Sequence, residues 1–292
     1  MTRSRHWWLR VLLLASGALS CAAQAPLSQQ SATLLLERRF PQKEIEYILV
    51  DARSGDLLSS RWVGADEPAP LGSLVKPFTA LAYGEEHNFL FPEFECHGKS
   101  DRCWLPRGHG HIGLEQAVAQ SCNAYFLSLA SGVKASSVAA VLRRYSIYDV
   151  GENVPTESLV GLGSAWKISP LRMLRAYAEL VRRRDQPGAA EVVRGMQISE
   201  SAGTGVAVGS ALRKSGATAL TKTGTAPCVH GAKDDAGGND EHRGSFAGDG
   251  YVIALYPAVD PKFALMVRLH SAPGSKAAEV AGKMLRTIAD GK

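Results

Sequence analysis

The sequence has no apolar run long enough to cross a membrane as a helix. Its longest N-terminal run, VLLLASGAL, is well short of the roughly 20 residues that a spanning helix needs. It also has no internal repeat and no low-complexity tract, which excludes a repeat architecture and a largely disordered chain. The 292 residues are 45% hydrophobic and 21% charged, a globular composition that suffices for one large domain or two small ones.

The first residues are typical of a secretory signal peptide rather than of a folded segment. Arg3, Arg5 and Arg10 flank HWW, a short apolar run follows, and small residues then appear in SCAAQA. We expect cleavage near Ala23, which makes 1–23 a Sec-type signal peptide and places the mature chain outside the cytoplasm in the periplasm. Lipidation at Cys21 ranks second, because Ala18 stands where a lipobox usually has leucine, and an uncleaved inner-membrane anchor ranks third.

The mature chain has little net charge. Without residues 1–23, 30 basic residues face 28 acidic ones, so the formal charge falls from +5 to +2. This weak excess does not predict nucleic-acid binding and mildly suits an anionic cell-envelope surface. We expect residues 24–43 to be a short linker and 44–292 to form a single domain.

Cysteine is scarce, and four cysteines remain after the signal peptide. Cys96 and Cys103 lie in CHGKSDRCWLPRGHGH and could close a short disulfide loop outside the cytoplasm. The histidines of this run, His97, His109 and His111, invite a zinc interpretation, but the spacing matches no standard zinc module. A disulfide or plain thiols are therefore preferred to a metal.

The order of predicted elements indicates an α+β fold. IEYILVDARSGDLLSSRWV reads as two strands around a turn, and YVIALYP and KFALMVRLH read as strands near the C-terminus. Helical patterns fill the middle, and SPLRMLRAYAELVRRR is the clearest, with Ser169 as N-cap and Pro170 as the first helical residue. Residues 88–113 look irregular. One antiparallel sheet completed by both ends of the chain, flanked by helices and interrupted by an all-helical subdomain, fits this order.

The stretch LGSLVKPF places Ser73 three residues before Lys76. Proline in a helix clashes with the carbonyl four residues earlier, so Pro77 is tolerated only if Ser73 lies in the first turn. Lys76 then shares the face of Ser73 and could take its proton if burial or nearby positive charge lowers the lysine pKa. The pattern Ser-x-x-Lys also occurs at Ser131–Lys134 and Ser164–Lys167, which we interpret as chance.

Two further motifs distinguish Ser73 from these decoys. Ser121 to Asn123, SCN, is the only Ser-x-Asn in the chain, and Lys222 to Thr225, KTGT, contains the only Lys-Thr-Gly. Three motifs in this order resemble the penicillin-binding transpeptidase and serine β-lactamase superfamily. GSLVKPFTALA, GHGHIGLEQAVAQSCNAYF and TKTGTA are similar to class B penicillin-binding proteins, and the resemblance covers roughly residues 45–270.

The resemblance implies a D,D-transpeptidase or D,D-carboxypeptidase acting on peptidoglycan stem peptides that end in D-Ala-D-Ala. By similarity, Ser73 attacks the penultimate D-alanine carbonyl, Lys76 accepts the serine proton, and Ser121 passes a proton to the departing D-alanine. Lys222 adds positive charge. The similarity assigns substrate binding to four further residues: Asn123 for an amide, Thr223 and Thr225 for the terminal carboxylate, and Gly224 for the substrate backbone. The backbone N–H groups of Ser73 and Thr225 would form the oxyanion hole.

The resemblance also implies covalent inhibition by β-lactams at Ser73 and no metal or organic cofactor. Class B proteins usually carry a long N-terminal pedestal, whereas only about 20 residues precede the first strand after cleavage. This departure leaves cross-linking, carboxypeptidase action and recruitment by another cell-envelope protein equally open.

Two alternatives remain at this point. A serine β-lactamase of class A type needs a glutamate to activate the deacylating water, and ENVPTESLV contains Glu152 and Glu157 without that pattern. The Tyr-Gly-Asn of the class D type is absent from the sequence. The chain could instead be a non-catalytic β-lactam or muropeptide sensor or a scaffold. Cys122, between two motif residues, also allows a redox-sensitive site.

Overall fold

The computed structural model describes residues 24–42, 44–148, 151, 153–227 and 248–290, with backbone alone for 24–30. The predicted signal peptide, its cleavage site and Cys21 therefore lie outside the described residues. So do Glu152, Cys228 and most of the polar loop that follows KTGT.

One five-stranded antiparallel sheet forms the centre of the molecule, in the order β2-β1-β7-β6-β5. Its strands are β1 (Glu46–Asp51), β2 (Leu57–Ser60), β5 (Leu220–Ala226), β6 (Asp249–Tyr256) and β7 (Phe263–Leu269). Strands from the two ends of the chain pair directly, because β1 aligns with β7 from Glu46↔Arg268 to Asp51↔Phe263. The α+β fold predicted from the sequence is confirmed, and β5 lies at one edge of the sheet.

Both faces of the sheet are buried, as the alternation along β1 shows. Tyr47 and Leu49 pack on one face with α8 (Val206–Leu212) and α9 (Gly274–Asp290). Ile48 and Val50 pack on the other face, toward the helices of the middle of the chain. Because successive side chains of a strand point to opposite faces, this short apolar run predicts a strand covered on both sides.

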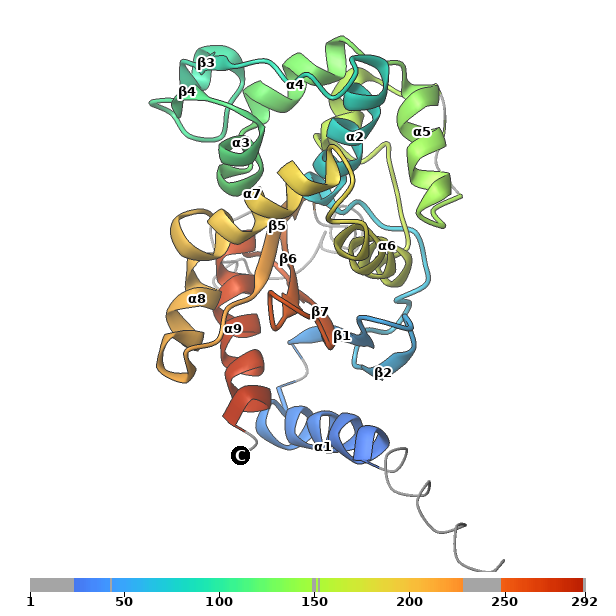
Figure 1. The fold of residues 1–292 in the computed structure, drawn as a ribbon, viewed down its shortest axis with the longest axis vertical. Helices are drawn as coiled ribbons and strands as arrows, with labels where there is room; N and C mark the ends of the chain where they lie inside the picture. The colour runs from blue at the N-terminus through green and yellow to red at the C-terminus, as the bar shows by residue number, and fades with distance from the viewer. Residues whose placement is uncertain (1–23, 43, 149–150, 152, 228–247, 291–292) are drawn as a thin grey trace, which may run out of the picture.

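The helices of the middle of the chain are α2 (Lys76–Glu86), α3 (Leu114–Gln120), α4 (Asn123–Ser131), α5 (Ala135–Arg144), α6 (Pro170–Arg182) and α7 (Ala189–Ala202). In Figure 1, α2 to α5 lie beyond one end of the sheet, whereas α6 lies against a face of the sheet and contacts β1, β6 and β7. The 3-10 turns among the described residues are η1 (Gly72–Val75), η2 (Gly98–Asp101), η3 (Thr156–Val160) and η4 (Arg213–Ser215). Ser169 caps α6 by accepting a hydrogen bond from the Arg172 N–H, and Pro170 follows it, as the sequence predicts.

Three features differ from the elements predicted from the sequence. Helix α1 (Gln24–Arg39) lies within the expected linker, and its Ala32 and Leu36 are buried in the cluster of the α9 face. Helix α7 was not predicted, although Val192 and Met196 lie four residues apart on its buried side. The irregular stretch at 88–113 contains a two-stranded sheet of β3 (Phe94–Cys96) and β4 (Gly110–Ile112). Tertiary packing outweighs weak local patterns in all three.

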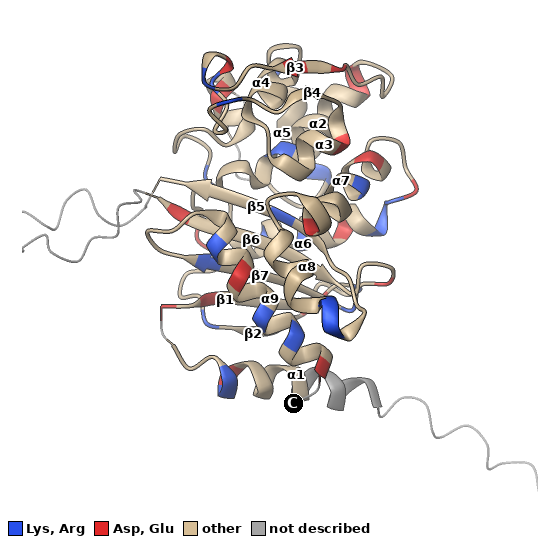
Figure 2. Ribbon diagram, turned by 90° about the vertical axis from the view of Figure 1, so that its left-hand side faces the viewer, with Lys and Arg blue, Asp and Glu red and all other residues tan. Residues whose placement is uncertain are grey.

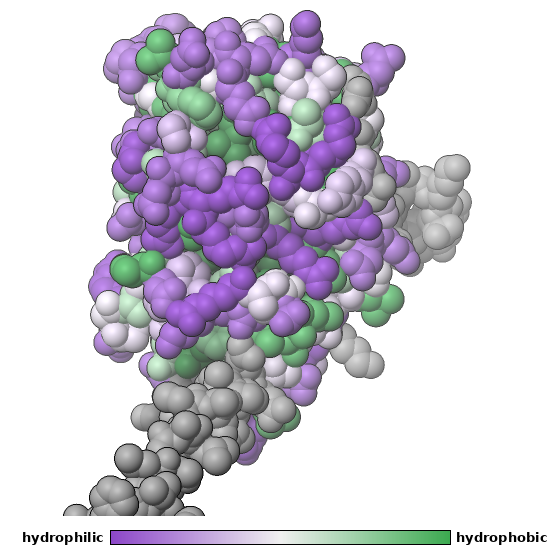
Figure 3. Space-filling model, turned by 45° about the vertical axis from the view of Figure 1, so that its right-hand side comes forward, coloured by the Kyte–Doolittle hydropathy of each residue, from purple (hydrophilic) through white to green (hydrophobic). Residues whose placement is uncertain are grey.

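Figure 2 shows basic and acidic residues interspersed along the helices, strands and loops of the ribbon. Figure 3 shows a mostly hydrophilic face on which hydrophobic residues form separate small patches. In the part of the chain that the structure describes, no single helix is long and apolar enough to cross a membrane. The pair α4 and α5, bent by 106°, meets the criterion by length and composition only.

Candidate active site

The turn that carries Ser73 is a 3-10 turn, η1, which runs directly into α2. Pro77 occupies the first turn of α2, where no intrahelical hydrogen bond is lost, as the sequence predicts. The Tyr177 hydroxyl of α6 donates to the Leu74 carbonyl at 2.8 Å, and this buried hydrogen bond ties the turn to α6. Ser73 is partly exposed, and within the described residues its hydroxyl has no hydrogen-bond partner in the protein.

The residue before Ser73 brings two distant segments into backbone contact. Gly72 has a φ of 56°, which favours glycine, and a Cβ there would lie 2.0 Å from the Thr225 carbonyl oxygen. On its other side, a Cβ on Gly161 would lie 1.9 Å from the Gly72 carbonyl oxygen. Glycine at position 72 therefore allows the main chain of Ser73 to lie beside the end of β5.

Lys76 is fully buried at the start of α2. Its Nζ donates to the Ser121 carbonyl oxygen at 2.8 Å and to Asn123 Oδ1 at 2.6 Å, and it lies 5.5 Å from the centre of the Phe126 ring. Burial lowers the pKa of Lys76 to about 7, against a small opposing effect of the nearby Cys122 and Cys103. A neutral amine has two hydrogens, and both are used by these acceptors, so its lone pair remains free to accept a proton.

Ser121 and Asn123 form the junction between α3 and α4. Ser121 ends α3 in the left-handed conformation, with φ 52° and ψ 39°, which costs a non-glycine residue about 1–2 kcal/mol. This conformation turns the chain so that the Ser121 carbonyl meets Lys76 while its hydroxyl meets Lys222. Strained backbone of this kind is common at functional sites.

Lys222 lies on β5 and completes the cluster. Its Nζ donates to Ser121 Oγ at 2.8 Å and to the Thr223 carbonyl oxygen at 2.7 Å. Burial, followed by repulsion from Lys76, holds the pKa of Lys222 well below its usual range. Lys76 and Lys222 are both buried and both contact Ser121, so a state in which both amines are charged is unfavourable. A single positive charge here would attract an incoming anion.

The structure thus brings Lys76, Ser121, Asn123 and Lys222 into one hydrogen-bonded set beside the turn of Ser73. Gly224 is on the same side of β5 as Lys222, since a Cβ on Gly224 would lie 2.7 Å from the Leu71 carbonyl oxygen. The arrangement offers a partly exposed hydroxyl, a neutral amine and a second amine, which are the parts of an activated serine nucleophile.

The two threonines are engaged in other hydrogen bonds. Thr223 Oγ1 donates to Thr204 Oγ1 at 2.6 Å, and Thr225 Oγ1 accepts from the Gly274 N–H at 3.2 Å. Their side chains alternate with Lys222 and Gly224 along β5, so they start from the opposite face of the strand. Thr204, which also donates to the Ala119 carbonyl, was missed by the sequence analysis because it belongs to no recognised motif.

A cluster of three cysteines and one histidine adjoins Ser121 and Asn123. Cys96, Cys103, Cys122 and His109 each offer one ligand atom, and these atoms lie within 4.8 Å of one another. The three cysteines are buried free thiols, so Cys96 and Cys103 are not joined in the disulfide that the sequence allows. His97 and His111 are instead exposed and paired with acidic residues.

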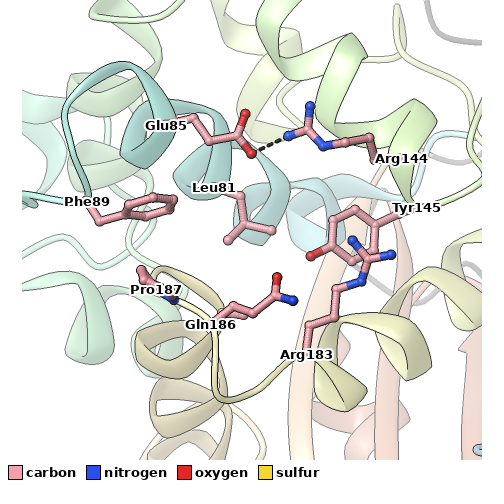
Figure 4. Close-up of a pocket in the computed structure, with 9 residues that line it drawn as sticks. Leu81, Glu85, Phe89, Arg144, Tyr145, Arg183, Gln186 and Pro187 are labelled. Atoms are coloured by element: carbon pink, nitrogen blue, oxygen red, sulfur yellow. Dashed lines mark hydrogen bonds and ion pairs between the residues drawn. The ribbon is translucent and has the colours of Figure 1, made fainter.

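A separate hollow of about 230 Å³ lies between α2, α5 and the start of α7 (Figure 4). It is lined by Leu81, Glu85 and Phe89, with the Glu85–Arg144 ion pair at its rim and Arg183 5.0 Å from the centre of the Tyr145 ring. Glu85 is nine residues beyond Lys76, about 13 Å along the helix at 1.5 Å per residue. The hollow is therefore not part of the serine–lysine cluster.

The hydrogen bond beneath the Ser73 turn gives a first prediction. Tyr177→Phe leaves the buried Leu74 carbonyl without its donor, and we expect a loss of about 1–3 kcal/mol in the free energy of unfolding, measured by denaturant titration. Tyr148→Phe, at a 58% exposed ring, is the control and should change it by less than about 0.5 kcal/mol. Equal effects of the two variants would show that the Tyr177 hydroxyl does not anchor the turn.

Comparison with known proteins agrees with this geometry. The model of a family described as "Penicillin binding protein transpeptidase domain" matches residues 48–290. None of the curated proteins compared with the chain matches it significantly.

Three solved structures share the fold at low sequence identity. Pseudomonas aeruginosa PBP2 in complex with WCK 5153 gives a TM-score of 0.69 at 18% identity, over 89% of this chain and 73% of that chain. Penicillin-binding protein PBP2 from Helicobacter pylori in complex with MreC gives 0.64 at 20% identity, over 88% and 61%. The D,D-transpeptidase domain of a peptidoglycan glycosyltransferase from Eggerthella lenta gives 0.63 at 14% identity, over 88% and 80%.

Proposed function

Because this chain belongs to the penicillin-binding protein transpeptidase domain family, we propose that it is a penicillin-binding serine acyltransferase. Its substrates are peptidoglycan stem peptides ending in D-Ala-D-Ala, and β-lactams are its covalent inhibitors. The observation that carries this proposal is the hydrogen-bonded set of Lys76, Ser121, Asn123 and Lys222 beside the partly exposed Ser73. No organic cofactor enters the proposed reaction.

Acylation begins with transfer of the Ser73 proton to the neutral amine of Lys76. Ser73 Oγ then attacks the carbonyl carbon of the penultimate D-alanine, and the peptide bond to the terminal D-alanine breaks. The departing amine takes the proton of the Ser121 hydroxyl, and the ammonium of Lys222, which donates to Ser121 Oγ at 2.8 Å, returns a proton to that oxygen. The proton taken from Ser73 then stays as the single positive charge shared by Lys76 and Lys222. The ester on Ser73 is released by an amine, giving a cross-link, or by water, giving a trimmed peptide.

Substrate binding is assigned to the edge of β5 and the residues around it. An extended peptide can add to the edge of a sheet, and the absence of a side chain at Gly224, where a Cβ would meet the Leu71 carbonyl oxygen, lets the edge strand β5 lie close to the Ser73 turn. Lys222 attracts the terminal carboxylate, and Thr223 and Thr225 can exchange their present hydrogen bonds for this anion. Asn123 holds a substrate amide. The contact of Gly72 with Thr225 supports an oxyanion hole made by the N–H groups of Ser73 and Thr225.

Of the two glutamates in ENVPTESLV, the structure describes only Glu157, and its surroundings do not favour the β-lactamase alternative. Glu157, in η3, accepts a hydrogen bond from Arg102 at 3.1 Å on an exposed surface, and its own backbone N–H together with this ion pair lowers its pKa. A glutamate held by an arginine in this way is a poor base for a deacylating water.

The proposal is tested by product analysis on a pentapeptide ending in D-Ala-D-Ala. We expect release of one D-alanine per turnover, with a tetrapeptide or, when an amine acceptor is supplied, a cross-linked product in the mass spectrum. Enzyme pre-acylated with penicillin is the control and should release none. Rapid steady hydrolysis of nitrocefin with no D-alanine release would identify a β-lactamase instead, and stable acylation with no turnover of peptide would favour a sensor.

The pKa of Lys76 predicts the pH dependence of acylation. Because only the neutral amine accepts a proton, the second-order rate of penicillin labelling should fall about tenfold for each pH unit below about 7 and level off above it. The titratable groups whose charges interact with the Lys76 amine are Lys222, Cys103, Cys122 and His109. A rate that is flat from pH 5 to 8 would exclude a neutral Lys76 as the base.

Placement in the cell and partners are also proposed. We assign the domain 44–292 to the extracytoplasmic space after removal of a signal peptide at 1–23, with 24–43 between them. The resolved complex of the Helicobacter pylori protein with MreC supports a cell-envelope protein as a partner of this chain.

A further inference from the structure

The cysteine–histidine cluster lies directly behind the segment that carries Ser121 and Asn123. Cys122 Sγ is 3.6 Å from Cys96 Sγ and 3.7 Å from Cys103 Sγ. His109 Nδ1 is 3.6 Å from Cys96 Sγ and 3.4 Å from Cys103 Sγ. The sulfurs are too far apart for disulfide bonds and face one nitrogen of the same ring.

These separations are those of four ligands around one zinc ion. Zn–S bonds of about 2.3 Å and Zn–N bonds of about 2.0–2.1 Å at tetrahedral angles place two sulfurs about 3.8 Å apart and a sulfur and a nitrogen about 3.6 Å apart. Four of the six separations between the ligand atoms lie within about 0.2 Å of these values, and the other two are at most 4.8 Å.

The surroundings of the ligand atoms suit a metal thiolate. N–H groups of Leu105, Ala124 and Asn123 point at the Cys103 sulfur, and the Tyr125 N–H donates to Cys122 Sγ at 3.5 Å. Thiolate sulfur and neutral imidazole are the ligands that zinc prefers.

The chain around the ligands is tightly packed through main-chain contacts and has little hydrophobic core of its own. A Cβ on Gly108 would lie 2.0 Å from the Cys96 carbonyl oxygen, and one on Gly98 would lie 2.2 Å from the Pro106 carbonyl oxygen. Strands β3 and β4 have three residues each, which is too short for a stable sheet alone. Small elements of this kind are commonly held together by a structural metal.

We propose that Cys96, Cys103, Cys122 and His109 bind one Zn²⁺ that fixes the Ser121–Asn123 segment against the β3–β4 insertion. Four protein ligands leave no open coordination position, so the ion is structural. It holds Cys122, the N-cap of α4, and through it the strained Ser121 and the Asn123 amide that contact Lys76. The coupling to acylation rests on the proposed function; the zinc site itself does not.

This proposal departs from the absence of a metal that the sequence analysis expects. The local run contains five cysteines and histidines but fits no zinc module, because the fourth ligand of the site, Cys122, comes from another motif. Two of the three histidines in the run point elsewhere.

The zinc site is tested first by the metal content of the full-length protein purified under reducing conditions. We expect about one zinc per chain by elemental mass spectrometry, and a fall of at least fivefold in Cys96→Ser, Cys103→Ser and His109→Ala. His97→Ala and His111→Ala are matched controls from the same run and should retain zinc fully. Zinc below about a tenth per chain after incubation with excess zinc would overturn the proposal, whether the cysteines then titrate as free thiols or as a disulfide.

Cobalt provides a second measurement, made on the unsubstituted chain, that does not depend on the folding of variants. Co²⁺ added to protein freed of metal should bind about one to one and give the thiolate charge-transfer and intense visible bands of a tetrahedral sulfur-rich site. Weak bands of an octahedral site, or none, would contradict the assigned ligands.

The positioning role is tested by the rate of penicillin labelling. We expect removal of zinc by a chelator to lower the rate at least tenfold and re-addition of zinc to restore it, with Ser73→Ala retaining a full zinc content. Protein that binds zinc but is not labelled by penicillin would support the zinc site and contradict the proposed acyltransferase function. Labelling at an unchanged rate in zinc-free protein would show that the ion does not position Ser121 and Asn123.

Discussion

Replacing Ser73 by alanine is expected to abolish covalent labelling by penicillin, with a loss of at least about a thousandfold. In the proposed reaction the ester forms on the Ser73 hydroxyl oxygen, and alanine has no such oxygen. Labelling is measured with a fluorescent penicillin on a denaturing gel and as a mass increase of the intact chain.

The chain provides its own controls for this substitution. Ser131 and Ser164 stand in the same Ser-x-x-Lys pattern but are exposed on the surface. Ser131→Ala and Ser164→Ala should label at the unsubstituted rate. Persistent labelling of Ser73→Ala, or its loss in either control, would assign the nucleophile elsewhere.

The second large effect is expected at Lys76. Lys76→Met keeps the length of the buried side chain and removes the amine, and the labelling rate should fall about 10²- to 10⁴-fold, the usual contribution of a positioned general base. The variant also loses the hydrogen bonds from Lys76 to Ser121 and Asn123, so a lower rate alone does not identify the base. The pH dependence of the rate does. Any residual labelling should lose the rise toward about pH 7 that the pKa of Lys76 produces.

Lys134→Met and Lys167→Met are the matched controls, because both lysines are exposed. Each should leave the rate and its pH dependence unchanged. A fall of less than about fivefold in Lys76→Met would place the base on another group, since removal of a general base normally has a larger effect.

The sequence predicts the sheet and the serine–lysine motif for identifiable reasons. The short apolar runs of β1 and β7 and the position of Pro77 after Lys76 are local signals, and a helix start or a strand follows from a few neighbouring residues. That Ser121 contacts both Lys76 and Lys222 is a long-range fact, which only the order of the motifs indicated.

Other features could not be predicted because they arise from packing between distant segments. Burial, which no local pattern reports, sets the pKa of Lys76. Thr204 reaches Thr223 from the loop after α7, a helix that carries no clear amphipathic pattern in the sequence. Cys122 lies 3.6 Å from Cys96 although the two are distant in the sequence. The cysteine spacing alone therefore predicted a disulfide or plain thiols.

The meeting of Gly161, Gly72 and Thr225 has a consequence for inhibitor escape. These three segments touch through main-chain atoms, with no room for a side chain at either glycine. An inhibitor that draws its affinity from the peptide groups at this junction meets nothing that a point mutation can exchange without pushing the segments apart. Resistance would then have to come from side chains around this junction or from reduced access to it, and not from its main chain.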